Sequence, residues 1–153
     1  MSQAQQQPRV LIIEDDDILR IMLFTILRHQ PLGVDTARSH EEAMEKVLAC
    51  DYALIIIDID LPDDESERFL RDFREQRPTA TSFIIAARDA HAERFIDPRS
   101  VAAVLNKPLE IDTLAEVIRE CAFLVPRPED PLPCPESESE IREKMDRASY
   151  QTN

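Results

Sequence analysis

Residues 54–63 read LIIIDIDLPD, and this stretch decides the fold. Four apolar residues lead directly into Asp58, and a second aspartate, Asp60, follows two positions later. A short run that is apolar at every position is typical of a strand buried on both faces, as in the centre of a parallel sheet. Several classes of protein use an aspartate at the end of such a strand to hold a metal ion or a phosphoryl group. Asp58 is therefore the first candidate site residue.

Short apolar runs alternate with helical patterns along most of the chain. Strands are predicted at 9–13, 33–37, 53–57, 82–87 and 101–105. Helical patterns follow them at 17–29, 39–50, around 69–73, 89–96 and 109–124. Repeated strand–helix units indicate an α/β fold, and right-handed crossovers place helices on both faces of the sheet. We expect a flavodoxin-like, doubly wound sheet of five parallel strands in the order 2-1-3-4-5.

Two of the predicted helices carry start signals. Asp17 is the expected cap of the first helix, and Ser39 with Glu42 has the spacing of a capping box at the start of the second. The apolar positions expected on one face of the first helix are Ile18, Met22 and Ile26. These signals place both helices directly after their strands.

The composition excludes several classes of function. A net charge of −13 argues against a nucleic-acid partner, because a phosphate backbone requires a basic face. The single glycine, Gly33, excludes a glycine-rich phosphate loop. No apolar run approaches the roughly 18 residues of a membrane helix, and the first residues lack a signal core, so we expect a cytoplasmic protein with no membrane partner. Cys50, Cys121 and Cys134 share no metal or redox spacing and are expected to be reduced thiols.

The end of the chain differs from the rest, because residues 126–153 are rich in proline and acidic residues. We therefore divide the chain into a flexible N-terminus (1–8), a folded domain (9–125) and this tail. Residues 138–148 place apolar side chains at helical spacing. Two interpretations of the tail stay open: a mostly disordered segment with transient helix, or a short helix that docks on a partner.

Four charged residues are predicted to meet at one edge of the sheet. Glu14 and Asp15 follow the first strand, Asp58 ends the third, and Lys107 ends the fifth. In the expected strand order the first and third strands are neighbours, so the three carboxylates converge at the carboxyl ends of the strands. Such crowding raises carboxyl pKa values unless a cation is present, and hard oxygen ligands suit Mg²⁺. Lys107 would offer a positive charge to a phosphoryl oxygen.

Three stretches, VLIIEDDD, LIIIDIDLP and LNKP, resemble in order and separation the response-regulator receiver family of two-component signalling. The resemblance covers about residues 8 to 124. It implies that Asp58 accepts a phosphoryl group from a histidine kinase or a histidine phosphotransfer protein. It further implies that Glu14 and Asp15 bind Mg²⁺ together with Asp58 and the backbone carbonyl of Asp60. Lys107, with a cis bond to Pro108, would contact the phosphoryl group.

The resemblance also implies that the chain is not an enzyme acting on a separate substrate. Its chemistry would be self-catalysed phosphotransfer followed by hydrolysis, and the signal would pass to an unidentified downstream protein. Two family positions are changed: Ala86 stands where the fourth strand usually carries Ser or Thr, and Val104 where the fifth usually carries Tyr or Phe. The usual relay from the site to the output surface is therefore missing. Ser66 lies near the position of a family glycine.

Two alternatives from other classes remain. DIDLP resembles the strand end of haloacid-dehalogenase-like phosphatases, in which Asp58 would be the nucleophile and Asp60 the acid–base group. That family needs further acidic residues downstream, whereas the acidic pair here lies upstream. A second alternative is a receiver-like scaffold for protein–protein interaction that is never phosphorylated. Ala86 and Val104 favour the scaffold, while the intact acidic residues and Lys107 oppose it.

Overall fold

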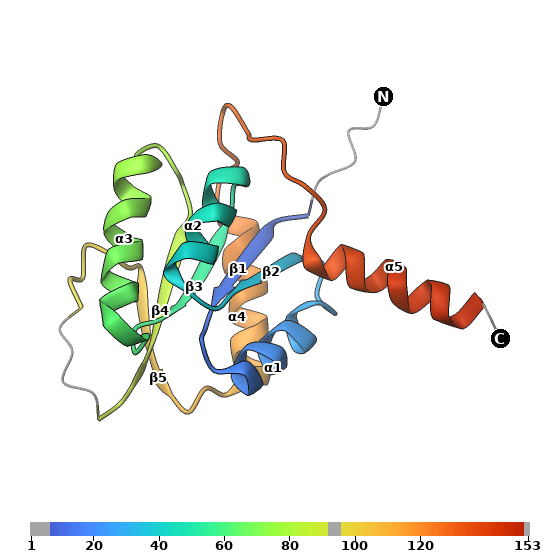
Figure 1. Ribbon diagram of the computed structural model, residues 1–153, viewed down its shortest axis with the longest axis horizontal. Helices are drawn as coiled ribbons and strands as arrows, with labels where there is room; N and C mark the ends of the chain where they lie inside the picture. The colour runs from blue at the N-terminus through green and yellow to red at the C-terminus, as the bar shows by residue number, and fades with distance from the viewer. Residues whose placement is uncertain (1–6, 92–95, 152–153) are drawn as a thin grey trace.

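The structure, a computed structural model, describes residues 7–91 and 96–151 (Figure 1). Its strands are β1 (Arg9–Ile13), β2 (Gly33–Ala37), β3 (Leu54–Asp58), β4 (Phe83–Asp89) and β5 (Ala103–Lys107). Its helices are α1 (Asp17–Leu27), α2 (His40–Ala49), α3 (Glu65–Gln76), α4 (Ile111–Leu124) and α5 (Glu138–Gln151), with a 3-10 turn η1 (Pro62–Asp64) before α3. The strands form one parallel sheet in the order β2-β1-β3-β4-β5, which confirms the predicted fold class.

The core lies on both faces of this sheet. Side chains alternate along β1: Val10 and Ile12 pack with α1 and α4, whereas Leu11 and Ile13 pack with α2 and α3. All four are at most 1% exposed. Full burial of one such side chain contributes about 1.5–3 kcal/mol to folding, so the central strands are firmly fixed. Strand ends, and the polar residues that follow them, are therefore held in place.

Helix α1 differs from the prediction in its cap and in its buried face. Asp16, not Asp17, caps the helix, and its side chain accepts a hydrogen bond from the Leu19 amide at 3.1 Å. Leu23 and Leu27 face the core, while Ile18 and Met22 of the predicted face are exposed. The prediction failed because α1 is apolar almost all round, so periodicity alone does not choose the buried face.

Helix α2 begins as predicted. The Ser39 hydroxyl accepts from the Glu42 amide at 3.2 Å, and the Glu42 carboxylate reaches back to the Arg38 amide at 2.8 Å. The helix ends at Ala49, and Cys50 is its C-cap residue. Among the described residues, none of the helices is long and apolar enough to cross a membrane.

The region around β4 and β5 departs from the prediction. Strand β4 extends to Asp89, and β5 starts at Ala103, two residues later than the sequence pattern indicated. Ala90 and His91 form a turn where a helix over 89–96 was predicted, and residues 92–95 of that prediction lie outside the described residues. Val104 is 43% exposed, so its face of β5 is open within the described part of the chain.

The C-terminal tail folds back onto the domain. Residues 126–136 pass the amino ends of the strands without regular structure and lead to α5, whose first turn lies beside β2 (Figure 1). Cys134 forms a disulfide with Cys50, so the prediction of reduced thiols is wrong for this pair. The two cysteines are 84 residues apart, and sequence spacing carries no signal for a contact made only by the folded tail. Cys121 is outside the disulfide.

Candidate functional site

Three carboxylates meet at the carboxyl ends of β1 and β3. Glu14 and Asp15 directly follow β1, Asp58 is the last residue of β3, and the two strands are hydrogen-bonded neighbours. One oxygen from each carboxylate lies within 4.8 Å of the others. Glu14 and Asp58 are each 3% exposed, while Asp15 is exposed. The predicted cluster therefore exists, with one member facing solvent.

Lys107 brings a positive charge to this cluster from β5. Its Nζ lies 3.1 Å from Asp58 Oδ1 and 3.9 Å from Glu14 Oε1. The side chain reaches past β4, where the residue paired with Asp58 is the small Ala87. The bond from Lys107 to Pro108 is cis, as the family resemblance implied. Lys107 is thus the cation that the described structure places on Asp58.

The cluster holds three carboxyl groups and one lysine, and this excess of acid shifts pKa values. Burial, a hydrogen bond shared with Asp58 and repulsion from the Asp58 charge raise the pKa of Glu14 to about 8. Burial opposes the charge of Lys107, but its hydrogen bond to Asp58 and the attraction of the nearby carboxylates outweigh this and raise the Lys107 pKa. At neutral pH Glu14 therefore holds a proton that a bound cation would displace.

The loop after β3 fixes Asp58 from two sides. The Asp60 amide donates to Asp58 Oδ1 at 2.9 Å, and the Ser66 hydroxyl donates to the Asp58 backbone carbonyl at 2.6 Å. The Asp60 carboxylate accepts from the Asp89 amide at 2.7 Å, so it fastens this loop to the end of β4. A carboxylate held in this way is a structural tie, which disfavours the phosphatase alternative that needs Asp60 as an acid.

Two residues that support the site were not predicted from the sequence. Ser66 is fully buried and anchors the loop, whereas the sequence indicated only that it lies near the position of a family glycine. Arg20 of α1 is 8% exposed, donates to the Glu14 carbonyl at 3.1 Å and forms an ion pair with Asp17. The spacing of Asp17 and Arg20, three residues apart on a helix, was the available signal.

The two changed family positions lie where the sequence analysis placed them. Ala86 is fully buried in β4, paired with Ile57 on one side and Val104 on the other. Its methyl group offers no hydrogen bond to a group bound at Asp58. Val104 offers neither a ring nor a hydroxyl, and it is partly exposed.

The donor set fits a hard divalent cation. Glu14, Asp15 and Asp58 supply carboxylate oxygens only, the ligands that Mg²⁺ prefers, and the exposed Asp15 leaves one side open to water. A buried protonated Glu14 beside the Asp58 carboxyl is the arrangement that a cation would relieve. The same edge, with Lys107 beside Asp58, can stabilise an incoming anionic group.

Comparisons with known proteins agree with this geometry. The family model of the response regulator receiver domain matches residues 10–119. The transcriptional regulatory protein PmrA of Pectobacterium parmentieri is 31% identical over 113 residues, which cover 72% of this chain and 50% of that protein. A protein-glutamate methylesterase/protein-glutamine glutaminase of Symbiobacterium thermophilum is 29% identical over 141 residues, which cover 83% of this chain and 39% of that protein.

Among solved structures, the response regulator TrrA of Thermotoga maritima, in complex with Mg²⁺ and BeF, aligns with a TM-score of 0.64 and 23% identity. The alignment covers 75% of this chain and 99% of that one. By contrast, the chain spans half or less of the length of the two curated relatives. The likeness therefore concerns one domain of those proteins.

Proposed function

The chain belongs to the response regulator receiver domain family of two-component systems, and on this premise we propose that it accepts a phosphoryl group on Asp58. The donor would be the phosphohistidine of a histidine kinase or a histidine phosphotransfer protein. The observation that carries the proposal is the position of Asp58. It is buried, fixed by the Asp60 amide, and has Lys107 Nζ 3.1 Å from its carboxylate.

The chain's own residues have distinct roles in this transfer. A carboxylate oxygen of Asp58 attacks phosphorus, the bond from phosphorus to the donor nitrogen breaks, and an acyl phosphate remains on Asp58. Lys107 moves its ion pair from the carboxylate to a phosphoryl oxygen, which keeps a positive charge beside the growing negative charge. The Asp60 amide and Ser66 hold Asp58 in position during the attack.

Glu14, Asp15 and Asp58, with the backbone carbonyl of Asp60, would hold Mg²⁺. When bound, this ion supplies the positive charge that lets an anionic phosphoryl group approach a carboxylate. Glu14 must lose its proton to become a ligand, and because its pKa is raised to about 8, the ion would have to displace this proton at neutral pH.

The wider assignment follows from the same proposal. The chain acts on itself by phosphotransfer and later hydrolysis, and is not an enzyme with a separate substrate. We place it in the cytoplasm, where it would meet its kinase, and expect a downstream protein partner. The net charge of −13 disfavours direct binding to nucleic acid.

The test is phosphorylation by acetyl phosphate with and without Mg²⁺, followed by intact-mass and peptide mass spectrometry. We expect Mg²⁺-dependent addition of one phosphoryl group to the peptide that contains Asp58, and no addition in Asp58→Asn. Asp97→Asn is the matched control, because Asp97 lies in a turn outside the site and should leave labelling unchanged. Labelling that persists in Asp58→Asn would place the acceptor elsewhere.

The scaffold alternative has its own supporting observation. Ala86 and Val104 lack the hydroxyl and the ring that would transmit a phosphoryl group to the surface. If neither acetyl phosphate nor a phosphorylated histidine phosphotransfer protein labels the wild type, while Mg²⁺ still binds, the scaffold replaces the phosphoacceptor as the best function.

A further inference from the structure

The outer edge of β2 is covered by the first residues of α5. The Val34 amide donates to Ser139 Oγ at 2.8 Å, and the Thr36 amide donates to Glu138 Oε1 at 3.0 Å. Both amides point away from β1 and would be free to pair with another strand without these contacts. We call residues 137–139, in their contacts with β2, the clasp.

The clasp is a specific buried contact. Asp35 of β2 is 3% exposed and accepts from the Glu138 amide, the first amide of α5, at 2.8 Å. The same carboxylate accepts from Arg9 Nε at 2.8 Å and from the Tyr52 hydroxyl at 2.6 Å. Ser137 is fully buried, and its hydroxyl accepts from the Glu140 amide at 3.2 Å, which caps α5. A carboxylate at a helix N-terminus is further favoured by the helix dipole.

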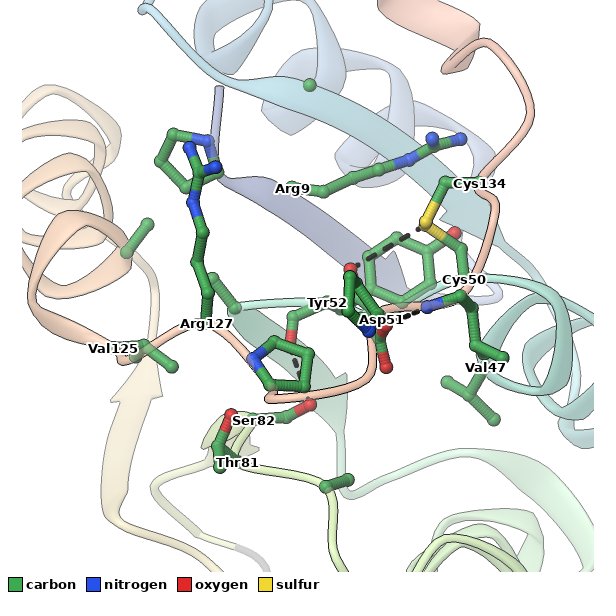
Figure 2. Close-up of a pocket in the computed structure, with 18 of the residues that line it drawn as sticks. Arg9, Val47, Cys50, Asp51, Tyr52, Thr81, Ser82, Val125, Arg127 and Cys134 are labelled. Atoms are coloured by element: carbon green, nitrogen blue, oxygen red, sulfur yellow. Dashed lines mark hydrogen bonds between the residues drawn. A yellow bond between two sulfur atoms is a disulfide. The ribbon is translucent and has the colours of Figure 1, made fainter. Parts of the chain in front are cut away.

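A strap, residues 125–136, leads from α4 to the clasp and closes one side of a cavity of about 830 Å³ (Figure 2). Several contacts hold the strap, including a hydrogen bond from Arg9 Nη1 to the Pro135 carbonyl. Thr81 Oγ1 donates to the Pro126 carbonyl at 3.0 Å, the Leu132 amide donates to Asp51 Oδ2 at 2.7 Å, and Cys134 is bonded to Cys50. The disulfide is the covalent member of this set, and it lies directly before the clasp.

The disulfide shortens the tether that holds the clasp against β2. Without it, the twelve residues 125–136 separate the clasp from the end of α4. With it, only residues 135 and 136 separate Cys134 from the clasp. The free-energy cost of closing a flexible loop rises with the logarithm of the number of residues in it, multiplied by about 3/2 RT. Cleaving the bond therefore lowers the effective concentration of the clasp at β2 by roughly tenfold.

We propose that thiol–disulfide exchange between Cys50 and Cys134 controls the clasp, and with it access to the edge of β2. Cys134 is partly exposed while Cys50 is 2% exposed, so an external thiolate reaches the Cys134 sulfur first. It forms a mixed disulfide with Cys134 and releases Cys50 as a thiolate, which takes up a proton. A second thiol then frees Cys134.

In total, two thiols of glutathione or of a dithiol protein pass two electrons and two protons to the bond and leave as their own disulfide. A disulfide oxidant such as oxidised glutathione reverses the reaction. In a reducing compartment a disulfide of this kind is transient, and transient bonds there are usually regulatory. The exchange uses none of the residues at Asp58, so it stands apart from the proposed phosphotransfer.

Hydrogen exchange of the Val34 and Thr36 amides tests this proposal. Exchange is measured by NMR in the variant Cys121→Ser, whose remaining cysteines are Cys50 and Cys134. The protein is first equilibrated in glutathione buffers that range from oxidising to reducing. We expect both amides to exchange roughly tenfold faster in the reduced protein and to regain protection on reoxidation. Ile12 and Ile56, in the central strands, are the controls and should keep their rates.

Two variants separate the disulfide from the rest of the clasp. Cys134→Ser should show the faster exchange in every buffer. Ser139→Ala should expose the Val34 amide while the disulfide remains intact. The proposal is overturned if Val34 and Thr36 exchange equally in both redox states, or if the bond survives millimolar reduced glutathione in the folded protein. It is overturned as well if reduction also accelerates Ile12 and Ile56, because the bond would then stabilise the whole domain.

Discussion

Asp35 and Asp58 are equally buried, each 3% exposed, yet their surroundings are opposite in kind. Asp35 receives hydrogen bonds from Arg9, Tyr52 and the Glu138 amide, all at 2.6–2.8 Å. Asp58 shares its site with Glu14 and Asp15 and has Lys107 at 3.1 Å. The first carboxylate is saturated with donors, while the second competes with other acids for charge.

This difference separates a structural carboxylate from the proposed phosphoacceptor. A buried charge is tolerated when donors and a counter-ion compensate its lost hydration, as Arg9 does for Asp35. The burial of Tyr52 and its contact with Asp35 raise the Tyr52 pKa, so the phenol remains a donor. Around Asp58 burial and the neighbouring acids raise the Glu14 pKa, and this crowding destabilises the fold when no cation compensates the charge. We therefore expect that removing the acid lowers the free energy of unfolding at Asp35 and raises it at the site of Asp58 and Glu14.

The largest effect is expected at the saturated carboxylate. Asp35→Ala leaves Arg9, which is 12% exposed at its side chain, without its counter-ion and removes the acceptor of Tyr52 and Glu138. We expect the free energy of unfolding to fall by about 3–5 kcal/mol, the usual effect of breaking a buried pair. Urea unfolding measures it. Asp97→Ala, which removes the partner of the exposed Arg99, should leave the midpoint unchanged, and a similarly small effect of Asp35→Ala would contradict the comparison.

The opposite sign is expected at the crowded site without metal. The pKa of Glu14 is about 8 in the folded protein against 4.5 for the free group. Because the folded pKa is raised, the stability that protonated Glu14 contributes is fully present below pH 4.5 and is lost as the pH rises through 8. Glu14→Gln should abolish this loss and stabilise the metal-free protein above pH 8 by on the order of 2 kcal/mol.

Adding Mg²⁺ should reverse the difference in stability between the wild type and Glu14→Gln. Saturating Mg²⁺ should stabilise the wild type through binding and leave Glu14→Gln almost unaffected, so the order of stability reverses. Glu45→Gln, the same change at an exposed position of α2, should alter neither the pH dependence nor the response to Mg²⁺. If Glu14→Gln destabilises the metal-free protein at pH 9 in urea unfolding, Asp58 and Glu14 form a satisfied pair like Asp35.

The two sites also differ in how far the sequence predicts them. Glu14, Asp58 and Lys107 each sit at the end of a strand, and the strand order alone brings those ends together. The partners of Asp35 include the Glu138 amide, 103 residues away on a tail whose sequence left open a disordered segment or a short docking helix. No local pattern marks a contact of that range.

The same limit explains the errors elsewhere in the chain. The disulfide from Cys50 to Cys134 depends on the folded path of the tail, which the spacing of cysteines does not reveal. The buried face of α1 depends on where the helix meets the sheet, because Ile18 and Leu23 are equally apolar in sequence but only Leu23 is buried. The central strands, by contrast, could be predicted from the sequence, because β1 and β3 are apolar on both faces.

The smallest predicted effect concerns what the site at Asp58 lacks. A bound ligand shifts a two-state equilibrium only by its difference in affinity for the two states. A hydroxyl that bonds a charged phosphoryl oxygen supplies about 1.5–3 kcal/mol of such a difference, and Ala86 cannot make this bond. We therefore expect beryllofluoride with Mg²⁺ to shift amide resonances in the loops around Glu14, Asp58 and Lys107, but not on the face of β4 and β5.

Restoring the missing groups tests this expectation. In Ala86→Thr with Val104→Tyr, the hydroxyl and the ring can bias the β4–β5 face by roughly ten- to a hundredfold in population, so beryllofluoride should now shift its amide resonances. Val104→Tyr alone is the control. Without the hydroxyl that Ala86→Thr introduces, no side chain on β4 links the tyrosine ring to the bound group. Because Val104 is 43% exposed, the ring can enter without displacing the core. Large shifts on the β4–β5 face of the wild type would contradict this expectation. They would show that Asp58 is coupled to this face through contacts other than a hydroxyl at position 86 and a ring at position 104.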